Sequence, residues 1–404
     1  MSKIAENLPA FRIHESRGGL DAGSLYGIYI GNIVGGASPS ASGKDKVAMD
    51  AKKTEAVIIT GGADAERSTV LGGALDVADA LALCGYGVSI VDTCRGVVSA
   101  ADVRWALRQE AGGQVPAPET LAKLRTREAR VPLIDLPEVR TADVAFLVLG
   151  DAGPYPALLE SIGVRCVGNS ISGTQFTKHK RIAKSVFRAA EVPTPDWLSW
   201  PVSPEDLNEL SFPLVVKPAR GGLSVGVSLV HTVAEVESAV ELASRFDDEV
   251  LIERYIEGRD FTVGILGDEP LSVGEIVSAG KLRDFGSKVS GLGNITFPAA
   301  IDDRLESELK SLALRAHRAL DLRHVSRADF RVDSQGAAFC LEVNGIPGIR
   351  RSSFMPRSAA AAGIDYETLC DKLCKLALGT ERRNEARRSP AGVSWDSRKN
   401  KFLL

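Results

Sequence analysis

The sequence lacks the features that mark several large classes of protein. None of its 404 residues lies in an apolar run that approaches the ~20 residues of a membrane span. The N-terminus has no basic region followed by an apolar core, so no secretory signal is expected. The formal net charge of -3 gives no reason to expect a polyanionic partner. We therefore expect neither a membrane nor a nucleic acid among its partners.

Cysteine is too scattered to indicate a structural metal site. The six cysteines include no CxxC pair and no cluster with histidine, and only Cys370 and Cys374 lie close together in the sequence. A zinc site is therefore not expected. Free thiols are the rule in a reducing compartment, so the sequence predicts a cytoplasmic location.

One common phosphate-binding motif is also absent. Gly43-Lys44 is similar to the end of a P-loop, but Asp45 stands where the motif has Ser or Thr. The preceding glycine, Gly36, is seven positions before Gly43 instead of five. Residues 35–43 are instead typical of a linker, so we reject a P-loop at this position.

A strand–helix–strand pattern begins near residue 54. Residues 56–60 form a continuous apolar run, typical of a buried parallel strand. We predict a helix from 65 to 82 and a second strand at 88–91, which together make a βαβ unit. Residues 144–149 read as a further buried strand. The sequence therefore predicts a parallel sheet with covering helices in the N-terminal part.

A glycine-rich segment follows in the middle of the chain. We predict one basic helix that starts with residues 178–184 and is broken by Pro193 and Pro195, and then a strand at 212–218 that ends on a lysine and a proline. Residues 220–226 are rich in glycine and lead into a strand at 227–230. Such a strand–loop–strand segment is typical of a flap that closes over phosphates, because glycines permit close backbone approach. An ordinary glycine-rich hairpin remains the alternative.

The last third of the chain continues with strands and helices. Strands are predicted at 250–256 and 258–266, and residues 281–290 are expected to be a mobile loop. Asp303 is predicted to cap a helix, with Glu306 completing a capping box. A final helix is predicted at 366–378. The charged C-terminal segment that follows it, residues 381–404, is predicted to be frayed.

Two strands near the C-terminus gather the polar residues of one face. Residues 325–332 and 338–344 alternate with a period of two, and the turn composition between them predicts a hairpin. The face opposite the core then carries Arg327, Asp329, Glu342 and Asn344. Carboxylate and amide oxygens suit Mg²⁺ that is bound together with phosphates. A solvated ion-pair patch is the alternative reading.

The order of these motifs resembles the ATP-grasp ligases, and within them the D-alanine–D-alanine ligase family. The motifs that carry the resemblance are Gly61–Arg67, Lys217-Pro218 with its glycine flap, Leu251–Glu253 with Phe261–Val263, Arg327–Asp329, Leu341–Asn344 running to Gly348, and Ser353–Pro356. The resemblance implies an α/β (α+β) chain with the ATP-grasp fold and an N-terminal Rossmann-like pre-ATP-grasp domain. It implies an extension at 1–53, a Rossmann-like substrate domain at 54–170, ATP-grasp subdomains at 171–255 and 256–380, and a tail at 381–404.

The same resemblance implies a nucleotide and metal site, with ATP and two Mg²⁺ ions, or Mn²⁺, as cofactors. The implied nucleotide contacts are Lys180 and Lys217 at the α- and β-phosphates, Ser224 in the flap, Glu253, Tyr255 and Ile256 at the adenine, and Asp260 at the ribose hydroxyls. The implied metal ligands are Asp329, Glu342 and Asn344. Within the basic run, Lys180 as an ordinary helix lysine stays open.

The implied catalytic and substrate residues surround the transferred phosphate. They are Lys288 at the γ-phosphate, Arg327 with the Gly348 N–H at the oxyanion, Glu66 at the first substrate's ammonium, and Ser353 with Phe354 at the second substrate. Glu66 as a simple helix-start acid, favoured there by the helix dipole, is an open alternative.

Several positions depart from the family's pattern. Leu223 and Val289 stand where the family has a flap serine and a lid tyrosine, and the family's His-Gly segment is missing near Asp151. Arg350 and Arg351 stand where it has small hydroxyl residues. We therefore expect the reaction to be ADP-forming ligation of an acid to an amine through an acyl phosphate, with an altered substrate pocket and D-alanine alone a poor substrate.

That expectation places the chain in a specialised metabolite pathway, where it would join amino acids, or an acid and an amino acid. A genuine D-alanine–D-alanine ligase of cell-wall synthesis is the first alternative. A nucleotide-binding relative without catalysis and a phosphotransferase that uses the same site are the others. Small-molecule acids and amines are the expected partners, and the resemblance implies a homodimer.

Overall fold

The computed structural model describes residues 53–64, 66–109, 118–128, 130–222, 224–277 and 294–379, together with the short strands β15 (Ser394–Asp396) and β16 (Lys401–Leu403). The N-terminal extension up to residue 52, Leu223, the predicted lid with Lys288 and Val289, and most of the C-terminal tail lie outside the described residues. Within the described part of the chain, no helix combines the length and the apolar character needed to cross a membrane.

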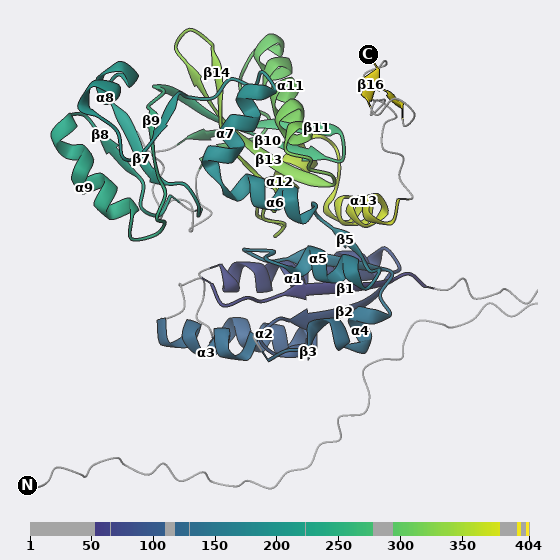
Figure 1. Ribbon diagram of the computed structural model, residues 1–404. Coiled ribbons are helices and arrows are strands. Elements are labelled where there is room, and N and C mark those ends of the chain that lie inside the picture. The colour runs from purple at the N-terminus through teal and green to yellow at the C-terminus, as the bar shows by residue number, and fades with distance from the viewer. Residues whose placement is uncertain are drawn as a thin grey trace, which may run out of the picture. The chain divides into compact units, whose positions relative to one another are not determined.

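The N-terminal part is a five-stranded sheet in the order β3-β2-β1-β4-β5 (Figure 1). The central strand β1 pairs in parallel with β2 and with β4, as the βαβ pattern predicts. The strands are β1 (Glu55–Thr60), β2 (Gly87–Asp92), β3 (Gly96–Val98), β4 (Val144–Val148) and β5 (Arg165–Val167). Neighbouring strands β1 and β4 lie where the strand order reverses, and ligands bind at such points beyond the carboxyl ends of the strands.

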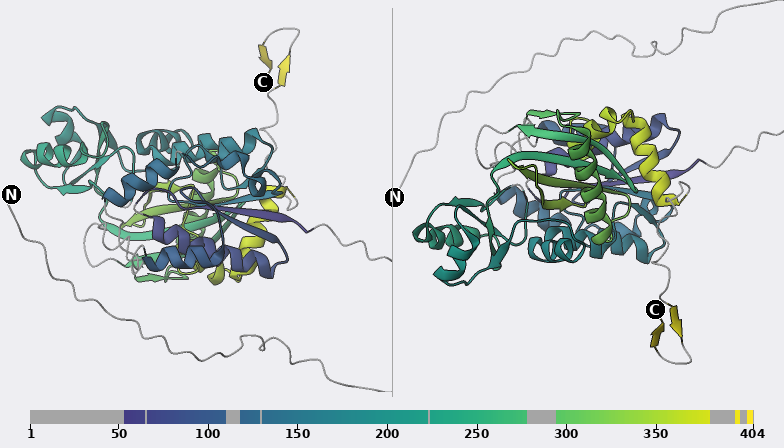
Figure 2. Two further views of the ribbon diagram at one scale, coloured as in Figure 1. Left: turned by 90° about the horizontal axis from the view of Figure 1, so that it is seen from below. Right: turned by 90° about the horizontal axis from the view of Figure 1, so that it is seen from above.

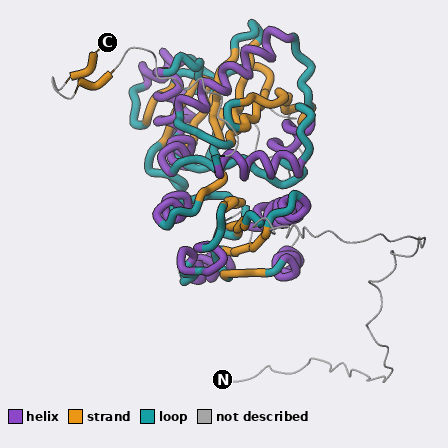
Figure 3. Tube along the Cα trace, turned by 90° about the vertical axis from the view of Figure 1, so that its right-hand side faces the viewer, coloured by secondary structure: helices purple, strands orange, loops and turns teal. Residues whose placement is uncertain are grey.

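Helices cover both faces of this sheet, because successive residues of β1 point to opposite sides. Ile58 packs against the helices α1, α2 and α13, whereas Ile59 packs on the side of α4 and α5. Figure 3 shows these strands between helices on both sides. The helices are α1 (Arg67–Leu83), α2 (Ala100–Gln109), α3 (Pro118–Glu128), the 3-10 turn η1 (Leu133–Asp135), α4 (Pro137–Arg140), α5 (Tyr155–Ser161) and α13 (Tyr366–Leu378).

A four-stranded sheet in the order β6-β9-β7-β8 carries the glycine-rich segment. On β7, Leu214 and Val216 enter the core beneath helices α8 and α9. The alternation therefore turns Val215 and Lys217 to the opposite face. The elements are β6 (Trp197–Ser199), β7 (Leu214–Pro218), β8 (Ser228–Val230), β9 (Val250–Arg254), α8 (Pro204–Leu210) and α9 (Val233–Ala243).

The third sheet has the order β12-β11-β10-β13-β14 and is antiparallel. In both views of Figure 2 its green strands lie beside the teal segment of the four-stranded sheet. Phe261 and Phe330 are completely buried in a core that includes α7 (Lys180–Ala189) and α11. The elements are β10 (Gly258–Leu266), β11 (Glu269–Val277), β12 (Asn294–Thr296), β13 (Val325–Asp333), β14 (Ala338–Asn344), α11 (Asp303–Ala319) and α12 (Phe354–Ala361).

Two predicted helices differ from the structure. The single basic helix from Lys178 is wrong, because His179 has an extended backbone and separates α6 (Ile171–Lys178) from α7 (Lys180–Ala189). The cap predicted at Asp303 is also wrong by one residue. Asp302 is the N-cap, and its side chain accepts a hydrogen bond from the N–H of Leu305.

The hairpin of β13 and β14 is confirmed, but its alternation is broken by an irregularity in register. Asp329 pairs with Glu342, whereas the next residue, Phe330, pairs with Cys340. One extra residue, Leu341, therefore stands on β14 between these pairs, as in a β-bulge. Cys340, which strict alternation groups with Glu342, is buried in the core instead. The bulge lets the strand bury Cys340 while Glu342 still lies opposite Asp329.

Candidate active site

A pocket lies between the four-stranded sheet and the sheet of β10–β14. Both polar and apolar residues line this pocket, and the apolar residues suit the flat ring of a purine. The polar lining is Lys180, Lys217, Ser224, Glu253, Arg254, Tyr255, Asp260, Asp329, Arg331 and Glu342. The apolar lining is Val215, Val225, Val227, Ile256, Phe261, Ile276, Phe330 and Leu341. The pocket thus brings together all seven residues that the resemblance implies for the nucleotide.

The flap forms one wall of this pocket. Lys180 begins α7, and its ammonium donates a hydrogen bond of 2.8 Å to the carbonyl of Gly221. Ser224 has a φ of 59°, a left-handed conformation that is uncommon for a residue with a side chain. Gly226 has a φ of 71°, and a Cβ there would lie 2.7 Å from the ring of Phe246. The flap therefore requires a glycine at position 226.

A buried carboxylate lies between two lysines at the base of the pocket. Glu253 is 2.7 Å from the Nζ of Lys217 through one oxygen and 2.7 Å from the Nζ of Lys184 through the other. Burial acts to raise the pKa of Glu253, but Lys184 and Lys217 together hold it below the ordinary value. Burial lowers the pKa of Lys184 to about 8, against the opposing pull of Glu253. The lysines on either side thus favour the charged form of the Glu253 carboxylate.

The predicted metal ligands lie on the facing strands of the other sheet. Asp329 and Glu342 are directly opposite, and Asn344 lies opposite Arg327. Thr262 donates a hydrogen bond of 2.8 Å to Asp329. Across the described residues, no group of three or more His, Cys, Asp or Glu side chains is arranged to hold a metal. Two carboxylates and an amide do fit Mg²⁺ that completes its shell with phosphate oxygens.

Arg327 is held from two sides next to these carboxylates. Its guanidinium donates to both oxygens of Asp329, at 2.9 and 2.8 Å, and lies 5.2 Å from the ring centre of Phe354. Burial alone would lower the pKa of Arg327, but Asp329 raises it above the ordinary value. A bidentate pair of this kind fixes orientation as well as charge.

The loop after β14 approaches the start of α12. A Cβ placed on Gly348 would lie 3.0 Å from the hydroxyl of Ser353, so the loop passes close to that side chain. Ser353 is the N-cap residue of α12, yet its side chain makes no capping hydrogen bond. A hydroxyl at a helix N-terminus suits an anionic group such as a carboxylate.

Two acids follow β1 at the other end of the site. Burial, with Asp64 nearby, raises the pKa of Glu66, and burial raises the pKa of Asp64 as well. A Cβ on Gly150 would lie 3.0 Å from the Cβ of Glu66, so the end of β4 closes over these acids. Arg327 lies near enough to oppose the rise in the pKa of Glu66. The predicted substrate acid and oxyanion arginine therefore belong to one region.

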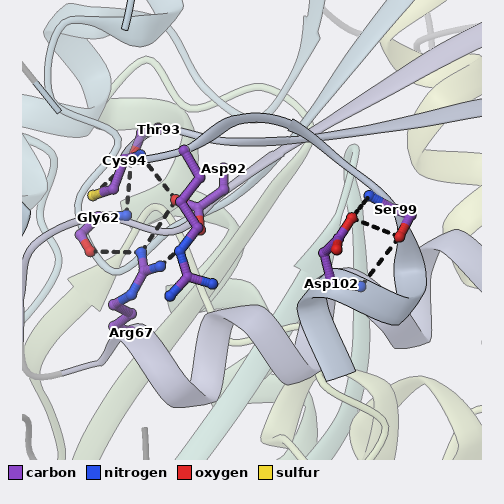
Figure 4. A network of polar contacts seen from close by, with 8 residues as sticks. Gly62, Arg67, Asp92, Thr93, Cys94, Ser99 and Asp102 are labelled. Atoms are coloured by element: carbon purple, nitrogen blue, oxygen red, sulfur yellow. Dashed lines mark hydrogen bonds and ion pairs between the residues drawn. The ribbon is translucent and has the colours of Figure 1, made fainter. Parts of the chain in front are cut away.

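A buried network fixes the loop that carries these acids (Figure 4). Arg67 is completely buried and donates to the two oxygens of Asp92, at 2.7 and 3.2 Å, and to the carbonyl of Gly62 at 3.0 Å. Thr93 accepts a hydrogen bond from the N–H of Gly62. The turn after β1 is thereby tied to the end of β2, which holds Glu66 at the start of α1.

The two arginines after Gly348 do not act as a pair. Arg351 is 2.6 Å from Glu367 and lies 4.2 Å from the ring centre of Tyr366, so its guanidinium is bound to α13. Arg350 is exposed and packs over α1, where a Cβ on Gly72 would lie 3.2 Å from its guanidinium carbon. Of the two arginines, Arg350 therefore remains the candidate for contact with a substrate.

Three residues of the site were not assigned a role from the sequence. Lys184 is four residues after Lys180 on α7, a spacing that places both on one helix face. Thr262 and Arg331 follow Asp260 and Asp329 by two residues on their strands, which also places them on a shared face. The sequence signal for all three is their spacing from a predicted site residue, which is four positions on a helix and two positions on a strand.

Comparison with known proteins agrees with this geometry. The family model described as "D-ala D-ala ligase C-terminus" matches residues 191–375. The D-alanine–D-alanine ligase of Desulfotalea psychrophila is 35% identical over 264 residues, which cover 60% of this chain and 82% of that protein. The ligase of Anaeromyxobacter sp. is 31% identical, and the match covers 78% of this chain and 94% of that one. The chain belongs to the D-alanine–D-alanine ligase family.

Solved structures agree on the fold. D-alanine–D-alanine ligase from Bacillus anthracis, complexed with ATP, superposes with a TM-score of 0.62 at 24% identity, covering 81% of this chain and 98% of that one. VanG D-Ala:D-Ser ligase from Enterococcus faecalis gives 0.66 at 22% identity, covering 81% and 100%. The predicted ATP-grasp fold is confirmed, and as a member of the family the chain is an ATP-grasp ligase.

Proposed function

We propose that this chain is an ADP-forming ligase that joins a carboxylic acid to an amine at the expense of ATP. The observation that carries the proposal is the pocket between the four-stranded sheet and the sheet of β10–β14. Lysines, acids and an apolar slot meet in it, and Asp329 and Glu342 lie at its edge. This arrangement suits a nucleoside triphosphate with its metal, and the Bacillus anthracis relative was solved with ATP.

The reaction then has two steps. The carboxylate of the first substrate attacks the γ-phosphate, ADP leaves and an acyl phosphate forms. The amine of the second substrate attacks the acyl carbon, and inorganic phosphate leaves from the tetrahedral intermediate. Both steps develop negative charge on oxygen, so fixed positive groups and backbone N–H groups should provide most of the rate enhancement.

The charged residues of the pocket divide between these tasks. Lys180 and Lys217 neutralise the phosphates, and Glu253 holds Lys217 in position until the nucleotide arrives. Asp329, Glu342 and Asn344 would hold Mg²⁺, which supplies charge neutralisation on the transferred phosphoryl group. Arg327 and the N–H of Gly348 stabilise the oxyanion of the second step. Lys288, which lies outside the described residues, is proposed at the γ-phosphate.

Two substrate pairs are candidates. Ligation of D-alanine to D-alanine is supported by the relatives, which carry that name at 31–36% identity. Ligation of an unlike pair is supported by the departures at Leu223 and Val289, which remove two hydroxyl groups from the first-substrate pocket of the family. Glu66 serves as the acid for the first ammonium under both, and Ser353 with Phe354 receives the second substrate.

Coupled assay of ADP release tests the reaction class. With ATP and Mg²⁺, the purified full-length chain should release ADP only when both an acid and an amine are supplied, and the amide product should be seen by mass spectrometry. ADP release that needs no amine, or transfer of phosphate to a stable product, would indicate a phosphotransferase instead. No ADP release with any pair, together with tight ATP binding, would indicate a non-catalytic relative.

Three further points belong to this proposal. The proposed domain boundaries at 54–170, 171–255 and 256–380 each enclose one of the three larger sheets. The six cysteines are unpaired, which suits the cytoplasm. A homodimer is proposed from the family resemblance, and the mass in solution tests it by light scattering.

A further inference from the structure

The ribose side of the pocket contains an arginine to which no role has been given. Arg331 lies on β13 directly opposite Asp260 of β10, so the two side chains share the face of the sheet that lines the pocket. The Nε of Arg331 is 3.3 Å from a carboxylate oxygen of Asp260, and the two side chains are 10% and 18% exposed. The ion pair is thus largely withdrawn from water.

The guanidinium of Arg331 is fixed by other contacts as well. It lies 4.9 Å from the ring centre of Tyr255, which follows β9 and lines the same pocket. One of its terminal nitrogens donates to the carbonyl of Gly258 at 3.4 Å. A planar guanidinium held against an aromatic ring and a carbonyl has little rotational freedom, so it presents a fixed partner to Asp260.

The same face carries a carboxylate two residues before Arg331 on β13. This is Asp329, which lies opposite Thr262 of β10. Residues i and i+2 of a strand are separated by about 7 Å. The metal ligand and the Arg331–Asp260 pair therefore lie side by side along one strand, as the phosphates and the ribose of one nucleotide would require.

We propose that Arg331 is a positioning residue that holds Asp260 for the ribose hydroxyls, and thereby sets a preference for ribonucleotides over deoxyribonucleotides. The inference rests on the proposed function, in which Asp260 contacts the ribose. An unpaired carboxylate beside a triphosphate would be repelled by it and free to turn. Arg331 compensates the charge of Asp260 and holds its carboxylate in one orientation. When a deoxyribonucleotide lacks a ribose hydroxyl, this fixed carboxylate is left without its hydrogen-bond donor, which weakens binding.

Strand β10, which carries Asp260, also offers a matched control. Arg259 of β10 also combines a carboxylate and an aromatic ring, since its Nε is 2.7 Å from Glu275 and its guanidinium lies 4.9 Å from the ring centre of Phe261. Its side chain is 49% exposed and does not belong to the pocket lining. Arg259→Met therefore removes a similar set of contacts without touching the ribose side.

Calorimetric titration with Mg²⁺ and ADP, 2′-deoxy-ADP or 3′-deoxy-ADP tests the inference without any amino-acid substrate. The wild-type chain should bind ADP at least ~10-fold more tightly than the weaker deoxy analogue, as expected for hydrogen bonds to a charged acceptor. Arg331→Met should reduce that ratio to within ~3-fold, and Asp260→Asn to a similar value. The double variant should reduce it no further, and Arg259→Met should leave it unchanged.

The outcomes distinguish the role of Arg331 from the proposed use of ATP. An unchanged ratio in Arg331→Met, or independent and additive effects of the two single variants on the ratio, would overturn the role of Arg331 while ATP use stands. Absence of ADP binding to the wild-type chain would overturn the proposed function and this inference together. Thermal unfolding of each variant shows whether it is folded, and Arg331→Lys, which keeps the charge but not the fork, should give an intermediate ratio.

Discussion

The ammonium of Lys184 lies 2.7 Å from one carboxylate oxygen of Glu253, and the two side chains are only 1% and 5% exposed. Lys184 also donates to the hydroxyl of Thr194 at 2.7 Å and to the carbonyl of Pro195 at 3.0 Å. Because the other oxygen of Glu253 contacts Lys217, two ion pairs join three ionisable groups at the base of the pocket. Of the two lysines, Lys217 is the one that lines the pocket, so we expect it to be the one that exchanges Glu253 for a phosphate.

Removing the central charge should destabilise the protein strongly. Glu253→Gln leaves Lys184 and Lys217 facing one another without compensation, and breaking a buried pair in this way costs about 3–5 kcal/mol. Urea unfolding should show the loss as a lower midpoint at an unchanged slope. The control is Asp196→Asn, which breaks the exposed pair with Arg188, and it should change stability by less than about 1 kcal/mol. Equal losses in both variants would contradict the arrangement.

Turnover should depend on the acid opposite Asp329. Glu342→Gln removes a charge from the face that meets the phosphates, so the rate at saturating Mg²⁺ should fall by ~10²-fold or more, as for other losses of charge stabilisation. The measurement is coupled ADP release with a productive pair. Glu269→Gln, an exposed acid on β11 of the same sheet, should leave the rate unchanged. Near-normal turnover in Glu342→Gln would remove Glu342 from the proposed metal site.

The acid limb of the pH profile should report Glu66. Burial raises its pKa above the ordinary value of 4.5, so the carboxylate that we propose binds the ammonium is protonated as the pH falls through that raised value. The kcat/KM for the first substrate should therefore decrease toward acid, with a midpoint above 4.5. Asp64→Asn removes a neighbouring negative charge and should move the limb to lower pH. A limb unchanged in both Asp64→Asn and Glu66→Gln would assign it to another group.

The sequence predicted most elements that bear on the site, because apolar periodicity and glycine-rich turns are local signals. The βαβ unit, the flap strands and the hairpin of β13 and β14 all follow from it. The bulge at Leu341 did not, since it depends on how Cys340 packs into the core. The pairing of Arg351 with Glu367 also could not be predicted, because these residues are joined only by the packing of α13.

Substrate choice should follow from the proposed first-substrate pocket. Leu223 and Val289, which the family resemblance assigns to it, have apolar side chains that cannot hydrogen-bond. Among the described residues, Asp64 and Glu66 form no ion pair with a lysine or arginine. Such a pocket favours a first substrate that brings a cation to the acids and a larger apolar body to the wall. Each additional buried methylene adds ~0.8 kcal/mol, or roughly fourfold in preference.

Coupled ADP release with D-alanine alone should therefore be at least ~10-fold slower than with the best unlike pair, an advantage that two buried methylenes provide. The panel should pair D-alanine, D-serine and larger apolar amino acids as first substrates with neutral and acidic amines as second substrates, and product masses identify what is joined. Arg350→Ala tests the second position, since it should lower turnover only with an acidic amine. Fastest turnover with D-alanine alone, with the mass of its dipeptide, would identify a D-alanine–D-alanine ligase and reject the altered pocket.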